Sequence, residues 1–176
     1  SNLDSADVLA FLDHAVTTVP GLDGARVCIM GGSYGGYLTA WIIAHDHRWA
    51  GAMVERGYLD PASFVGASDI GWFFPAQYNG SKEQMDAQSP MLLTDRVTTP
   101  TLVIHGARDY RVPDAQGLAY YNTLKALGID ARLLWFPDEN HWVLSPQHAA
   151  LWYGTVSAFL SEHVLGEAKD YPELLG

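Results

Sequence analysis

The chain has 176 residues, of which 48% are hydrophobic and 17% charged, a composition that suits one domain with a sizeable buried core. Its net charge of −10 and the lack of Lys/Arg runs argue against a nucleic-acid partner, and the single cysteine, Cys28, excludes a disulfide framework. We expect neither a metal nor another cofactor. No apolar stretch approaches the roughly 20 residues of a membrane span, and the sequence opens without a signal-peptide pattern, so the default expectation is a cytoplasmic protein without a membrane partner.

The first half of the chain alternates helical and strand-like patterns. Apolar residues recur at helical spacing from Val8 to Val19, where Pro20 and Gly21 predict the end of a helix. Short runs predict strands over 27–30 and 50–54, separated by a helix from Tyr34 to about residue 46.

The second half begins with an irregular or short-helical stretch over 57–99, rich in aromatic residues, Gly and Pro. Strands are then predicted over 101–105 and 132–136, with a helix over 113–127 that Gly128 closes. A last helix carries an apolar stripe that consists of Leu151, Trp152, Val156, Phe159 and Leu160. This alternation predicts an α/β fold with a mostly parallel sheet of about four strands, flanked by helices.

The most informative motif directly follows the first predicted strand. Gly31, Ser33 and Gly35 fit the pattern G-x-S-x-G, the nucleophile elbow, in which a sharp turn presents a serine at the end of a strand. The bare pattern fits equally well a glycine-rich turn with an incidental serine. A serine hydroxyl needs an adjacent base, and the base needs an orienting acid, so further residues decide between these interpretations.

Candidate partners follow in the order that this architecture requires, acid before histidine. Asp109 lies in the loop after the strand predicted over 101–105, and His141 lies in the loop after the strand predicted over 132–136. Asp138 and Glu139 are rival acids, but only Asp109 follows the earlier strand. Ser33, Asp109 and His141 are therefore the predicted catalytic residues.

These motifs resemble the catalytic domain of the prolyl oligopeptidase family of serine peptidases, with most similarity to its acylaminoacyl-peptidase and bacterial dipeptidyl-peptidase branch. The resemblance covers nearly the whole chain and lies in three segments, 30–37, 105–113 and 137–144. It implies an α/β-hydrolase fold and a peptidase that cleaves short peptides through an acyl-enzyme. It also implies that the backbone N–H of Tyr34 is one oxyanion donor.

Substrate contacts are expected from two regions. Arg111 stands two residues after the predicted acid, and the resemblance implies that its guanidinium binds a peptide carbonyl. The alternative for Arg111 is an ion pair with a local acid such as Asp114. The stretch over 57–99 is expected to form an apolar pocket for a substrate side chain. Its predicted substrate-binding residues are Tyr58, Phe64 and Trp72.

The resemblance also implies that the 176 residues are the C-terminal part of a single α/β-hydrolase catalytic domain. We expect the first strands of that fold, the second oxyanion donor and any β-propeller domain to lie outside this sequence. Removing one oxyanion donor costs on the order of 100- to 1000-fold in turnover, so activity of the chain by itself is in question. Two alternatives remain: an α/β-hydrolase esterase with the same catalytic residues, and a folded, inert fragment that associates with itself.

A homodimer or a higher homo-oligomer is expected from the first strand. The run over 27–30 is apolar on both faces, as interior parallel strands are, yet the sequence predicts no strand before it. An edge strand without charge, proline or bulge is prone to pair with another chain.

Overall fold

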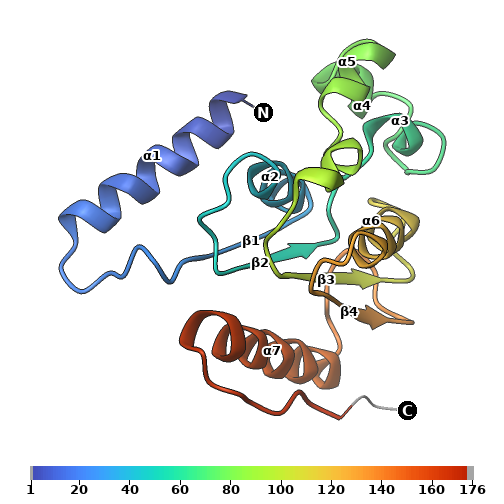
Figure 1. Cartoon of the computed structure of the whole chain (residues 1–176). Helices are drawn as coiled ribbons and strands as arrows, with labels where there is room; N and C mark the ends of the chain where they lie inside the picture. The colour runs from blue at the N-terminus through green and yellow to red at the C-terminus, as the bar shows by residue number, and fades with distance from the viewer. Residues whose placement is uncertain (1, 174–176) are drawn as a thin grey trace.

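The computed structural model describes residues 2–173, and its centre is one four-stranded sheet (Figure 1). All neighbouring strands are parallel, and their spatial order equals their order in the chain. The strands are β1 (Cys28–Gly32), β2 (Gly51–Glu55), β3 (Thr101–Gly106) and β4 (Ala131–Phe136). The predicted α/β architecture is confirmed.

Helices connect the strands and cover both faces of the sheet. The longer ones are α1 (Asn2–Thr18), α2 (Tyr34–Ile43), α6 (Ala115–Ala126) and α7 (Pro146–Leu160). The stretch between β2 and β3 contains the short helices α3 (Pro61–Phe64), α4 (Phe74–Tyr78) and α5 (Lys82–Ala87) and the 3₁₀ helix η1 (Pro90–Arg96). A π-helical segment, η2 (Ser161–Leu165), continues α7. As expected, the region over 57–99 is short-helical rather than extended.

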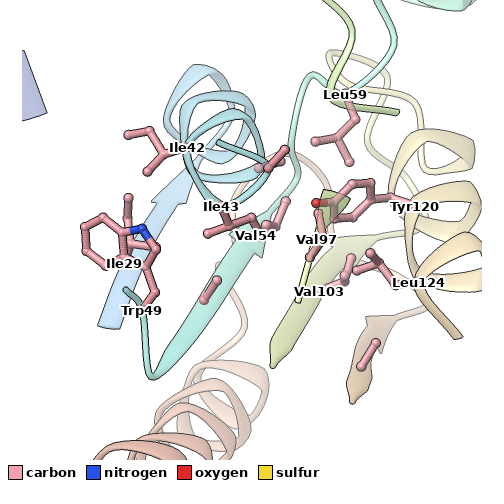
Figure 2. Packing of buried hydrophobic residues seen from close by; sticks show 14 residues of the cluster. Ile29, Ile42, Ile43, Trp49, Val54, Leu59, Val97, Val103, Tyr120 and Leu124 are labelled. Carbon is pink, nitrogen blue, oxygen red and sulfur yellow. The ribbon is translucent and has the colours of Figure 1, made fainter. Parts of the chain in front are cut away.

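The sheet lies between two helical layers. In Figure 1, α2 and α6 lie on one face and α7 on the other, while α3, α4 and α5 form a separate group beside them. Figure 2 shows the core on the α2 and α6 side, where Ile43, Val54, Val103, Tyr120 and Leu124 pack together. This packing fixes the carboxyl ends of the strands, from which the candidate site is built.

Element boundaries differ slightly from the expectation. Helix α2 ends at Ile43, about three residues earlier than predicted, and Gly128 closes α6 with a φ of +79°, as the sequence indicates. Glycine adopts this left-handed backbone at no steric cost.

Strand β1 lies at an edge of the sheet. Within residues 2–173 its hydrogen-bonded neighbour is β2 alone, and the Met30 side chain is 48% exposed. None of the helices in the described part of the chain is long and apolar enough to cross a membrane.

Candidate active site

The candidate nucleophile, Ser33, lies at a sharp turn between β1 and α2. Its φ of +62° is in the left-handed region, which residues other than glycine rarely adopt. Two backbone hydrogen bonds hold the turn: the Ser33 N–H donates to the Glu55 carbonyl at 3.0 Å, and the Tyr37 N–H donates to the Ser33 carbonyl at 3.0 Å. Local strain at an exposed turn is the geometry that the elbow motif predicts.

A glycine at position 36 allows this turn to lie against β2. A Cβ atom at Gly36 would come within 2.6 Å of the Glu55 carbonyl oxygen and 2.8 Å of the Gly57 Cα. Both neighbours are backbone atoms and cannot rotate away. Gly36 therefore sets how closely the start of α2 approaches the end of β2.

Asp109 and His141 are in direct contact, although 32 residues separate them in the sequence. Asp109 Oδ2 lies 2.8 Å from His141 Nδ1, and Asp109 Oδ1 accepts the backbone N–H groups of Arg111 at 3.0 Å and Val112 at 2.9 Å. Burial by itself raises the pKa of Asp109, but hydrogen bonds from His105, His141 and Val112 outweigh it and hold this pKa well below its usual range. The carboxylate is thus charged and accepts a hydrogen bond from the protonated Nδ1, which leaves Nε2 as the ring nitrogen able to take up a proton.

Ser33 and His141 meet at one cavity of about 310 Å³. The hydrogen bonds of residues 2–173 do not include one between the Ser33 hydroxyl and the His141 ring, so the two groups share a cavity without a direct bond in this structure. The cavity is lined by Ser33, Tyr34, Tyr58, Phe64, Ile70, Phe74, Arg111, Val112, His141 and Trp142.

The expected pocket residues separate into two groups. Tyr58 and Phe64 are buried, pack edge to face with ring centroids 4.6 Å apart, and line the cavity. Trp72 does not: its side chain is 81% exposed and lies outside the cavity lining, packed against Phe73. Trp72 lies within consecutive hydrogen-bonded turns, and its neighbours Ile70 and Phe74 line the cavity instead.

Arg111 reaches the cavity and also forms an ion pair. Its Nε and Nη2 donate to the two carboxylate oxygens of Asp69, at 2.8 and 3.2 Å. The acid is therefore Asp69, from the segment between α3 and α4, and not the sequence neighbour Asp114. Both side chains of the pair are 48% exposed, and this ion pair raises the pKa of Arg111 and lowers that of Asp69. The guanidinium stays charged at the cavity wall.

The rival acids hold the loop of His141 rather than its ring. Glu139 is buried, accepts the backbone N–H groups of Leu144 and Ser145 at 3.0 and 2.9 Å, and lies 2.7 Å from His148 Nδ1. Asp138 is half exposed and lies 3.6 Å from the same nitrogen. Glu139 thus ties both ends of the loop to the start of α7.

Tyr34, the expected oxyanion donor, is the first residue of α2. The first N–H groups of a helix have no partner within the helix, so this N–H is available at the turn beside Ser33. The Tyr34 hydroxyl donates to the Asp4 carboxylate, which fixes the phenol ring between the cavity and α1. Burial and this bond together raise the pKa of Tyr34.

Sequence reasoning missed several residues that touch these groups. The buried ring of His105 lies 3.5 Å from Asp109 Oδ2, with Nε2 also 2.9 Å from the Val112 carbonyl. Glu55 is the last residue of β2, Arg56 directly follows it, and Asp69 lies 42 residues from its partner Arg111. For Glu55 and Arg56 a signal existed, because charged residues at the carboxyl end of a buried parallel strand lie at the edge where such sites form. For Asp69 the sequence offers none.

Within residues 2–173 no group of three or more His, Cys, Asp and Glu side chains is arranged to hold a metal ion. Burial raises the pKa of the Cys28 thiol to about 12, so this cysteine is not a reactive thiolate at neutral pH. The Ser33 hydroxyl and the His141 imidazole line the cavity, and the Asp109 carboxylate contacts that imidazole.

The arrangement is that of an α/β-hydrolase, and comparisons with known proteins give its family. The prolyl oligopeptidase family profile matches residues 2–167, so the chain belongs to the prolyl oligopeptidase family, a family of serine peptidases. The chain is 35% identical over 144 residues to the uncharacterized peptidase YuxL of Bacillus subtilis, a match that covers 78% of this chain and 22% of that protein.

Two further relatives agree. Dipeptidyl-peptidase 5 of Porphyromonas endodontalis is 34% identical over 140 residues, which are 74% of this chain and 20% of that enzyme. The structure of Pyrococcus horikoshii acylaminoacyl peptidase superposes with a TM-score of 0.91 at 27% identity, over 96% of this chain and 29% of that one. The chain therefore spans about a fifth of the length of these curated relatives.

Proposed function

We propose that the chain carries the catalytic centre of a serine peptidase that hydrolyses short peptides of the acylaminoacyl- or dipeptidyl-peptidase type. The observation that carries this proposal is the contact between buried Asp109 and His141 beside a strained serine in one cavity. The names of the relatives, acylaminoacyl peptidase and dipeptidyl-peptidase 5, support the substrate class. We also propose that residues 1–176 are the C-terminal part of one catalytic domain, with the first strands and any β-propeller outside this sequence.

In this proposal each residue has one role. His141 Nε2 takes the proton of the Ser33 hydroxyl as its oxygen attacks the peptide carbonyl, and Asp109 holds the ring by its other nitrogen and stabilises the imidazolium. The Tyr34 N–H stabilises the oxyanion of the tetrahedral intermediate. His141 then gives the proton to the leaving amine. In the second half of the reaction, water attacks the acyl-enzyme while His141 takes its proton, and His141 returns that proton to the Ser33 oxygen as the acyl group leaves.

The cavity is proposed to select the substrate. Tyr58 and Phe64 supply an apolar wall for the side chain next to the cleaved bond, and Arg111 donates to a carbonyl oxygen of the peptide. Because Asp69 balances the charge of Arg111, a neutral carbonyl fits this donor without the desolvation of a second charge.

Hydrolysis of matched substrates tests the proposal. An acylated aminoacyl amide, a dipeptidyl amide and a simple acyl ester are offered to the chain, with Ser33→Ala as the blank. Cleavage of either amide that Ser33→Ala loses supports the peptidase, whereas cleavage of the ester alone assigns an esterase. No cleavage of any of them, with the chain folded, contradicts an active centre in this chain and favours the inert fragment.

A further inference from the structure

A partly buried ion pair occupies the carboxyl end of β2, beside the catalytic cavity. Arg56 Nη1 lies 2.8 Å from Glu55 Oε2, and the Trp152 indole N–H donates to the other carboxylate oxygen, Oε1, at 2.8 Å. Glu55 is buried, and Arg56 exposes about a fifth of its side chain. The pair is thus anchored to α7 through Trp152.

The guanidinium of Arg56 lies between the nucleophile strand and the loop of the base. On one side, a Cβ atom at Gly32, the residue before Ser33, would come within 2.8 Å of Arg56 Nη2. On the other side, Arg56 Cζ lies 5.0 Å from the centroid of the Trp142 ring, a cation–π distance. Trp142 in turn packs edge-on against His141, with centroids 5.6 Å apart.

The backbone of Arg56 is held in an unfavourable conformation. Its φ of +36° makes it one of two residues other than glycine with positive φ in the described part of the chain, and the other is Ser33. The Arg56 N–H donates to the Ile104 carbonyl at 2.7 Å, which ties this residue to β3. Strain of this kind persists only where surrounding contacts impose it, and it gathers at functional sites.

We propose that Arg56 is a positioning residue, which sets the place of the His141 loop relative to Ser33 through the face of Trp142. It acts through another residue, because it does not line the catalytic cavity; it lines a separate cavity of about 320 Å³ behind Trp142. A planar guanidinium serves here better than an ammonium, since it stacks on the indole while its edge still donates to Glu55. The inference rests on the proposed roles of Ser33 and His141.

The test uses Arg56→Met, with Arg26→Met as the matched control. Arg26 also pairs with a single neighbouring acid, Asp23, but lies away from the site. One readout is the rate at which a fluorophosphonate labels Ser33. The other is the far-downfield NMR signal of the His141 Nδ1 proton shared with Asp109, which a purely structural role for Arg56 would leave in place in the folded protein.

Arg56→Met is expected to label at least tenfold more slowly and to lose or broaden the downfield signal, while Arg26→Met keeps both. Arg56→Lys keeps the charge but loses the planar guanidinium, so its labelling rate is expected to lie between those of Arg56→Met and Arg26→Met. If Arg56→Met does not fold, Arg56→Lys is used for the test in its place. A folded variant that labels within twofold of the unchanged chain and keeps the signal overturns the inference. If the unchanged chain itself does not label, the proposed activity fails, and the downfield signal alone decides the role of Arg56.

Discussion

At the scale of single residues, the proposed chemistry depends most on the hydrogen bond between Asp109 and His141. The Asp109 side chain is fully buried, and asparagine is the uncharged residue of the same shape that can replace it. In serine peptidases such a replacement leaves the geometry intact but favours the wrong histidine tautomer. Asp109→Asn is therefore expected to slow fluorophosphonate labelling of Ser33 by about 10⁴-fold, measured against Asp95→Asn, an exposed acid, as control.

The same carboxylate predicts a dependence of stability on pH. The pKa of Asp109 is lowered on folding, so its contribution is present above the unfolded value of about 3.9 and is lost as the pH falls towards the lower folded value. The free energy of unfolding should fall on acidification below about pH 4, and less steeply in Asp109→Asn. Urea unfolding over a pH series measures this, and parallel curves for the two proteins would contradict the assignment.

Arg111 has two candidate roles, and paired variants separate them. The exposed ion pair with Asp69 stabilises the fold by no more than about 1 kcal/mol, so Arg111→Ala and Asp69→Asn should both leave the unfolding free energy nearly unchanged. If Arg111 binds a peptide carbonyl, Arg111→Ala lowers kcat/KM for peptides, whereas Asp69→Asn retains most of it. Equal kinetic losses in the two variants would mean that the ion pair alone matters.

At the scale of elements, the junction between β1 and α2 leaves no room for a side chain at Gly36. A methyl group at Gly36 would meet the backbone of β2, whereas a methyl group at Gly35, one residue earlier, would meet nothing within 4 Å. Gly36→Ala is expected to destabilise the fold by about 1–3 kcal/mol, and Gly35→Ala to be neutral or slightly stabilising. Thermal unfolding of the two variants compares them directly, and similar melting temperatures would show that the junction adapts.

The strands and longer helices could be predicted because periodicity and glycine or proline boundaries are local signals. The acid and the histidine could be placed for a related reason: parallel strands bring their following loops to one edge, so Asp109 and His141 had to lie near Ser33. The direction in which a loop side chain points depends on tertiary packing and not on a local pattern. For that reason the sequence did not indicate that Trp72 would be exposed instead of lining the cavity. Partners such as Asp69 for Arg111 depend on how the short helices fold over the cavity, which no pattern in the sequence encodes.

At the scale of the whole molecule, the open edge of β1 predicts association, which stays a prediction. Edge strands expose unpaired N–H and C=O groups, and Met30 adds an exposed apolar side chain there. Light scattering is expected to show a dimer or a larger assembly, and Met30→Lys to shift it towards monomer because charge on an edge strand opposes pairing. A monomer at high micromolar concentration in the unchanged chain would contradict this expectation.

We propose that His141 and Asp109 activate Ser33, and the site of covalent labelling tests this activation. The folded chain is treated with a fluorophosphonate and the modified residue is located by peptide mass spectrometry, alongside Ser33→Ala and His141→Gln. One adduct is expected, on Ser33, that is absent from Ser33→Ala and strongly reduced in His141→Gln. An adduct on another residue, or labelling of Ser33 at the same rate without the His141 imidazole, would contradict it.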